Sequence, residues 1–174
     1  MKLIIKTSFI LFFIFVSQIV NAQKLNQKLV GVYIINFIKN IEWPDNATSK
    51  EFLVGIIGNG TMEVELTKLA NNRKIQGRTI KVKAITASEA KNCHLVYINA
   101  SESNKAKDIN KNFSLLPILI VSEKQGMAKN GADISMFLDF DNELTTKFEV
   151  NKNKIEQKKL KISKDLISLS TIVN

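Results

Sequence analysis

The stretch "VYIINFIKNIEWP", residues 32–44, joins an amphipathic segment to the only tryptophan of the chain. Between Leu25 and Ile41 the apolar residues recur at the period of an α-helix, which predicts a helix with one side in a core. That side consists of Val30, Tyr33, Ile34, Phe37, Ile38 and Ile41. Pro44 cannot continue the helical hydrogen bonds and disfavours helical geometry at the residue before it. Trp43 therefore marks the exit from the helix.

Two interpretations of Trp43 are open. We expect its ring to pack in the core at the end of the first helix; the alternative is a ring presented at the surface for a partner or ligand. Val32 and Ile35 fall on the opposite side of the helix, among polar residues such as Lys28 and Asn36. Apolar pairs rimmed by polar groups often mark interaction sites, although single exposed apolar residues are ordinary. Val32, Ile35 and Trp43 are therefore the candidate partner- or ligand-binding residues.

The rest of the chain alternates strand and helix patterns. Short apolar or alternating runs predict about six strands, near residues 52–58, 78–85, 94–99, 117–122, 132–140 and 144–150. Helices are expected from Thr61 to the Asn71–Asn72 pair, at 105–112, from Asn151 and after Ser163. This order predicts a single α/β domain with a mixed β-sheet of about six strands, flanked by helices on both faces.

The N-terminus predicts export. Lys2 and Lys6 precede the apolar run "FILFFIFV", and "VNAQ" offers the small residues of a cleavage site near Ala22. We expect a signal peptide at residues 1–22 and an α/β domain at 23–174, located in the periplasm. A transmembrane anchor is the alternative, but it needs about 20 apolar residues and the run is interrupted early. The single cysteine, Cys93, excludes an intramolecular disulfide.

The net charge of +9 comes almost entirely from lysine, with Arg73 and Arg78 as the only arginines. Nucleic-acid sites lean on arginine and interleave it with aromatic residues, so we expect no nucleic-acid partner. Six lysines gather at the end of the chain, Lys152, Lys154, Lys158, Lys159, Lys161 and Lys164. They predict a solvated face, with contact to anionic lipid or an acidic partner as the alternative.

No motif predicts catalysis. The only histidine, His94, follows Cys93, and neighbours on a strand point to opposite faces, which argues against a zinc site or a Cys–His dyad. "GIIGNGT" has the wrong glycine spacing for a phosphate-binding loop and predicts a turn before a helix. "DFDNE", residues 139–143, lacks the calcium-loop pattern and predicts a hairpin turn. We expect no metal, no cofactor and no enzyme activity.

Several segments in order resemble the YfiR/HmsC-like family of exported bacterial proteins. They are "VYIINFIKNIEWP", "FLVGIIG", "IQGRTIKVK", "NCHLVYINASE", "PILIVSEKQGMAKNGADISMFL", "FEVN" and "LKISKDLISLSTIV". The resemblance implies a periplasmic α/β domain, often dimeric and without known catalysis. The resemblance also implies that family members which resist or sense redox change pair the cysteine before the histidine with another one, commonly in the first strand. The corresponding position here holds Gly55, so disulfide-based regulation is not expected.

The resemblance also implies a function. Some members repress an inner-membrane diguanylate cyclase from the periplasmic side, and others are associated with sensor kinases. The leading hypothesis is therefore a periplasmic regulator that binds the periplasmic domain of an inner-membrane signalling protein, with a homodimer possible. The second hypothesis is a small-molecule-binding sensor module, acting with a sensor kinase or transporter, in which Trp43 lines the site.

Overall fold

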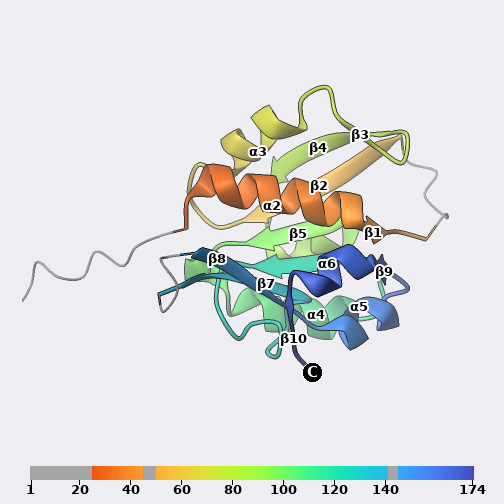
Figure 1. Cartoon of the computed structure of the whole chain (residues 1–174). Coiled ribbons are helices and arrows are strands. Elements are labelled where there is room, and N and C mark those ends of the chain that lie inside the picture. Colours follow the sequence, from red (N-terminus) through yellow and green to blue (C-terminus); the bar gives the residue numbers. More distant parts are fainter. Residues whose placement is uncertain (1–24, 45–49, 141–144) are drawn as a thin grey trace, which may run out of the picture.

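The computed structural model describes residues 25–44, 50–140 and 145–174 (Figure 1). The predicted signal peptide and most of "DFDNE" lie outside these ranges. The first described helix, α2 (Gln27–Asn40), begins at Asn26, whose side chain accepts hydrogen bonds from the backbone N–H groups of Lys28 and Leu29. It ends at Asn40, three residues before Trp43, because Ile41–Glu42 leave it to form the short strand β1.

The main sheet is mixed, with eight strands in the order β10-β8-β7-β6-β5-β2-β4-β3. The six predicted strands are all present: β2 (Glu51–Ile57), β4 (Arg78–Ala84), β5 (Leu95–Ile98), β6 (Leu119–Ser122), β7 (Ile134–Asp139) and β8 (Thr145–Val150). The predicted count is too low, because the two-residue strands β3 (Lys74–Ile75) and β10 (Thr171–Ile172) extend the two edges. The central pairs are parallel, whereas β3–β4 and β7–β8 are antiparallel.

Helices cover both faces of the sheet, as predicted. Along β5, Leu95 and Tyr97 join one buried cluster while Val96 and Ile98 join the other. The first cluster lies under α2 and α3 (Met62–Ala70), and α5 (Lys152–Gln157) and α6 (Lys164–Ser168) contribute Ile155 and Leu166 to it. The second cluster lies under the 3-10 helix η1 (Ala87–Asn92) and α4 (Lys105–Phe113). A second 3-10 helix, η2, spans Ala100–Glu102.

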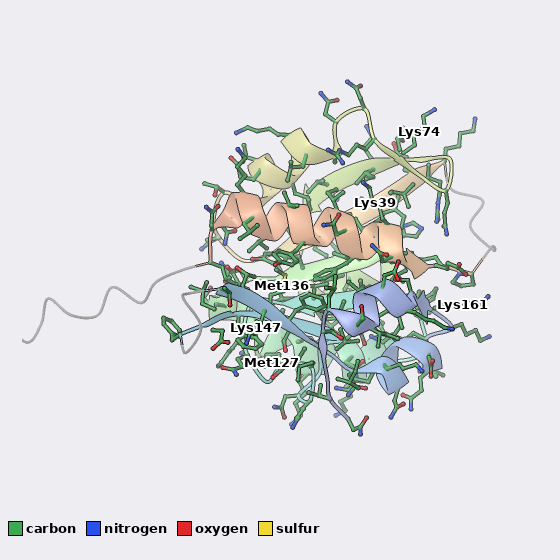
Figure 2. All side chains as sticks on the ribbon, viewed as in Figure 1. Lys39, Lys74, Met127, Met136, Lys147 and Lys161 are labelled. Atoms are coloured by element: carbon green, nitrogen blue, oxygen red, sulfur yellow. The ribbon has the colours of Figure 1, made fainter. Side chains whose placement is uncertain are left out.

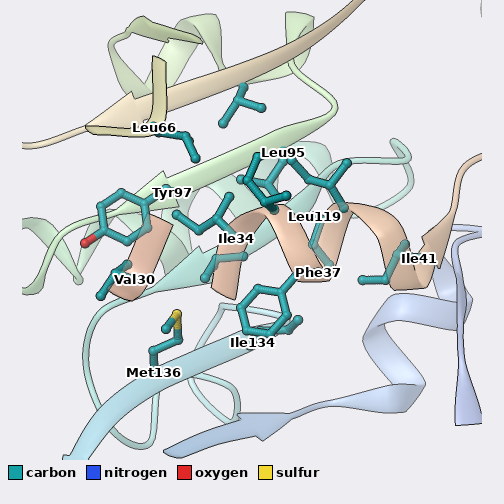
Figure 3. Close-up of a cluster of buried hydrophobic side chains, with 14 of the residues drawn as sticks. Val30, Ile34, Phe37, Ile41, Leu66, Leu95, Tyr97, Leu119, Ile134 and Met136 are labelled. Atoms are coloured by element: carbon teal, nitrogen blue, oxygen red, sulfur yellow. The ribbon is translucent and has the colours of Figure 1, made fainter. Parts of the chain in front are cut away.

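The first helix supplies the centre of the larger cluster (Figure 3). Val30, Ile34 and Phe37 are fully buried and Ile41 nearly so, which confirms the apolar side predicted for this helix. Figure 3 shows Phe37 beside Ile134 of β7 and Ile34 near the strand residues of the same cluster. Each large apolar side chain that is fully buried stabilises the fold by about 1.5–3 kcal/mol. The segment "VYIINFIKNIEWP" therefore anchors α2 on the sheet.

The C-terminal lysines do not form one solvated face. Lys158, at the end of α5, is 1% exposed, and its Nζ lies 2.8 and 2.7 Å from the two carboxylate oxygens of Asp133. The prediction of a solvated residue is wrong for Lys158, because its side chain reaches a buried carboxylate and the Ile118 carbonyl, 3.2 Å away. Other lysines spread over the outside: Lys39, Lys74 and Lys161 come from three different elements and lie apart in Figure 2.

A second, two-stranded sheet holds the start of Trp43's segment in place. Strand β1 (Ile41–Glu42) pairs antiparallel with β9 (Lys161–Ile162), so that the end of α2 is tied to the C-terminal region. Ser163 caps α6, as predicted, by accepting a hydrogen bond from the Leu166 N–H at 3.1 Å. Among the described residues, none of the helices combines the length and the apolar character that crossing a membrane would require.

Candidate functional site

Trp43 packs inside the protein at the amino end of the central strands. Its side chain is 6% exposed, and its ring meets Phe52 edge-on with ring centroids 4.8 Å apart. The indole Nε1–H donates a hydrogen bond to the carbonyl oxygen of His94 at 3.1 Å. The expectation of a packed ring is confirmed. A role in binding stays a prediction, which depends on the cavity that the ring borders.

Arg78 reaches the same place from the β3–β4 hairpin. Gln76 and Gly77 form its two-residue turn, with φ values of 49° and 78°, in the left-handed region that such turns favour. Glycine adopts this conformation freely, whereas for Gln76 it is unfavourable. The Gln76 side chain contacts Arg78, because its Oε1 accepts a hydrogen bond from Arg78 Nη2 at 2.6 Å. The turn thus fixes the guanidinium, which lies over the Phe52 ring at 5.3 Å.

His94 lies next to Arg78 and also contacts Phe52. The two rings stack with centroids 4.7 Å apart, and His94 Nδ1 accepts a hydrogen bond from the Leu53 N–H at 3.0 Å. Burial, and then the charge of Arg78, lower the pKa of His94 below 6.5, so the ring is neutral at pH 7. A neutral imidazole that accepts at Nδ1 carries its proton on Nε2. Nε2 and Arg78 Nη1, 3.1 Å apart, are then two adjacent donors.

A cavity of about 240 Å³ opens beside these side chains. It is lined by Trp43, Pro44, Arg78, Lys91, Asn92, Cys93, His94, Leu116, Pro117 and Ile118. None of these residues is acidic, and two carry a fixed positive charge. The cavity lies where β4, β5 and β6 begin, so its walls come from segments that are far apart in the sequence.

Cys93 has no role as a nucleophile in this arrangement. It packs into the second cluster while His94 faces the first, which confirms that the two side chains diverge. Burial, and then the charge of Glu89, raise the pKa of Cys93 to about 11, so the thiol stays protonated. A β-carbon placed on Gly55 would lie 2.8 Å from the Cys93 sulfur. Gly55 thus occupies the position from which a second cysteine would reach Cys93.

The two other candidate binding residues, Val32 and Ile35, differ in their exposure. Val32 is 40% exposed, whereas Ile35 is 3% exposed and belongs to the larger cluster. The expected exposure of Ile35 is wrong, because α3 packs against α2 and widens its buried side; a β-carbon on Gly31 would lie 2.7 Å from Leu69 of α3. The sequence analysis missed Leu29, which is 42% exposed and lies one turn before Val32. The exposed apolar pair on α2 is therefore Leu29 and Val32.

The described residues of the site form no constellation that indicates catalysis. Within residues 25–44, 50–140 and 145–174, no group of three or more His, Cys, Asp or Glu side chains could hold a metal ion. The neutral His94 has no adjacent nucleophile, since Cys93 points away. The arrangement offers fixed donors, a positive charge and aromatic walls.

The sequence matches a family model over most of its length. The model described as YfiR/HmsC-like matches residues 27–171, nearly all of the described structure. The chain belongs to the YfiR/HmsC-like family. This family is regulatory rather than catalytic. Four of the segments that carry the resemblance line one cavity, through Trp43–Pro44, Arg78, Cys93–His94 and Pro117–Ile118.

A solved structure shows the same fold at low identity. A conserved domain protein from Vibrio cholerae O1 biovar El Tor aligns with a TM-score of 0.56 and 13% identity, covering 87% of this chain and 62% of that chain. This YfiR/HmsC-like chain thus corresponds to less than two thirds of that protein. An ABC domain from Streptococcus pneumoniae in complex with L-Trp aligns with a TM-score of 0.46 and 10% identity, covering 70% of this chain and 55% of that chain. No curated protein matches the sequence.

Proposed function

We propose that this protein is a periplasmic regulator, which represses an inner-membrane signalling protein of the diguanylate cyclase type by binding its periplasmic domain. The observation that carries the proposal is the match to the YfiR/HmsC-like family over residues 27–171. The signal-peptide pattern predicted at residues 1–22, with a predicted cleavage site near Ala22, supports a periplasmic location. A domain without a catalytic constellation can still regulate, because a docked partner is held in its inactive state by differential binding alone.

The surface that we propose for docking is the exposed apolar pair on α2. Leu29 and Val32 lie one turn apart and are 42% and 40% exposed. Their polar neighbours Lys28 and Asn36 are also exposed, so the pair has a polar rim. Interfaces commonly combine an apolar centre with such a rim. Two copies of this chain could also associate through this surface, which keeps the homodimer within the proposal.

The test is the cyclic-di-GMP content of the source bacterium. Deleting the gene should raise it, and a plasmid copy should lower it again. A copy without residues 1–22 should fail, because it would remain in the cytoplasm. A copy with Leu29→Asp and Val32→Asp should also fail although it is folded and exported. The matched control is Leu115→Asp, which changes an 80% exposed leucine after α4, the helix that covers the other face of the sheet.

Two results would count against the proposal. An unchanged cyclic-di-GMP content after deletion would show that no diguanylate cyclase is under the control of this protein. Full repression by the Leu29→Asp, Val32→Asp copy would show that docking uses another surface. Light scattering on the purified double variant tests the homodimer separately, since a smaller mass than that of the wild type would place the dimer interface on α2.

A second candidate function rests on the cavity beside Trp43. We propose, as the alternative, a sensor module that binds a small molecule there and acts with a sensor kinase or transporter. The cavity has an aromatic wall and a buried arginine, features that orient small ligands in other proteins. Both functions are compatible, because a ligand that binds the regulator can shift its affinity for a membrane partner.

A further inference from the structure

We infer that the cavity beside Trp43 binds a small organic carboxylate, whose charged end contacts Arg78 and whose apolar body lies along the cavity wall. This inference gives a ligand class to the second candidate function and rests on it. The first supporting observation concerns the burial and the charge of Arg78. Its side chain is 8% exposed, yet within the described residues no carboxylate forms an ion pair with it. Buried charges are normally paired.

The groups around Arg78 are neutral. Gln76 offers an amide oxygen, Phe52 offers a ring face, and His94 is uncharged at pH 7. These contacts hold the guanidinium in place, but they do not cancel its charge. Of its five N–H groups, the one that meets Gln76 has an acceptor. An arginine that is fixed in position and has no counter-ion among residues 25–44, 50–140 and 145–174 can bind an anion.

His94 adds the second observation. Because Nδ1 accepts from Leu53, the protonated Nε2 lies 3.1 Å from Arg78 Nη1, so two donors stand side by side without an acceptor between them. Adjacent donors repel each other in a buried site. A carboxylate oxygen that accepts from both would remove this mismatch and would place the anion against the Phe52 stack.

The shape and lining of the cavity favour a carboxylate with an apolar body over a free phosphate. Trp43, Leu116 and Pro117 form apolar walls, and the volume of about 240 Å³ exceeds what a single inorganic ion fills. Lys91 stands exposed at the rim and adds positive charge, while no lining residue is acidic. Phosphate sites typically use a helix N-terminus or a glycine-rich loop, and the lining includes no glycine.

The experiment uses the fluorescence of Trp43, which is the only tryptophan of the chain and borders the cavity. Purified protein is titrated with hexanoate, with hexylamine, which has the opposite charge on the same chain, and with inorganic phosphate. Calorimetry gives the dissociation constants. We expect saturable binding of hexanoate with a dissociation constant below about 1 mM and no binding of hexylamine. Phosphate should bind more weakly than hexanoate.

Variants locate the site. Arg78→Gln should weaken hexanoate binding at least tenfold, since it removes a charge-assisted hydrogen bond to the carboxylate. Arg73→Gln is the matched control, because Arg73 is the other arginine, is exposed and lies outside the cavity. The Arg73→Gln variant should bind hexanoate with the affinity of the wild type. Lys91→Gln, at the rim, should weaken binding by about two- to fivefold. Circular dichroism shows whether each variant is folded.

Several outcomes would overturn the inference: no saturable response to hexanoate up to about 10 mM, equal binding of hexylamine, tighter binding of phosphate, or equal affinity in Arg78→Gln and the wild type. If Arg78→Gln does not fold, the Lys91→Gln variant is the test instead. The inference is then overturned if Lys91→Gln binds hexanoate with the affinity of the wild type. A ligand of another charge that binds beside Trp43 would refute the carboxylate and keep the sensor function. The cyclic-di-GMP experiment is independent of all these results.

Discussion

Replacing Lys158 by methionine tests the buried ion pair that joins α5 to the sheet. Methionine keeps most of the apolar length of the side chain, so the change removes the charge with little change in volume. Asp133, which is fully buried, would keep the hydrogen bond from the Ile120 N–H at 2.7 Å and the more distant charge of Lys154. The Ile118 carbonyl would lose its contact with Nζ. The variant would thus leave a buried carboxylate without its counter-ion.

Breaking such a pair from one side costs about 3–5 kcal/mol. For a domain of this size, each kcal/mol lowers the melting temperature by about 2–4 °C, so Lys158→Met should melt about 6–20 °C below the wild type. Urea unfolding followed by circular dichroism measures the free energy directly. The control is Lys152→Met in the same helix, where an exposed ion pair with Glu156 contributes at most about 1 kcal/mol.

A double variant separates charge from packing. Asp133→Asn removes the second charge and keeps an oxygen for the Ile120 N–H. Combined with Lys158→Met, it should regain at least about 1 kcal/mol relative to Lys158→Met alone, because no uncompensated charge remains. The reasoning would be refuted if Lys158→Met were no less stable than Lys152→Met, or if the double variant lost the sum of the two single losses.

Four further predictions concern the candidate site. Trp43→Ala should lower the free energy of urea unfolding by about 3–5 kcal/mol, and a loss below about 1 kcal/mol would contradict the packed ring. Cys93, whose pKa burial raises to about 11, should not react with a thiol reagent near pH 8 until the protein is unfolded. His94, whose pKa is lowered by burial, should titrate below 6.5 in proton NMR. The free energy of unfolding should be highest above pH 6.5 and should decrease as the pH falls toward this lowered pKa. Arg78→Met should cost less than about 2 kcal/mol in urea unfolding, because the lost contacts are offset by removal of an unpaired charge.

The sequence predicted the parts of the fold that leave a periodic pattern. The apolar side of α2 and the six longer strands follow from runs of many residues, in which each position repeats the same burial rule. Strands β3 and β10 have two residues each, too few for any period, and they form only because β4 and β8 offer an unpaired edge. Ile35 was misplaced for a related reason, since a helical projection shows one helix and not the second helix that packs on it.

The candidate site depended on strand order, which no local pattern contains. Strand β2 lies between β4 and β5, so Arg78 at the start of β4 and His94 just before β5 flank Phe52 of β2. The sequence separates these residues by long segments and marks none of them as buried. It did show that Cys93 and His94 diverge, because alternation along a strand is local. Trp43 was recognised for the same reason, through its position beside Pro44.

Two cationic side chains are buried in the described part of the chain, and their surroundings differ. Lys158 and Arg78 are 1% and 8% exposed, and both would normally be assigned to the surface. Lys158 lies against a carboxylate that is itself fully buried, so the pair is complete within the protein and contributes to stability. Arg78 has only neutral neighbours among the described residues, so its burial is compensated less well. A buried charge that the fold does not neutralise is unfavourable for stability, and sites of this kind persist where a ligand completes them. The contrast supports our proposal that Arg78 contacts a ligand, whereas Lys158 stabilises the fold.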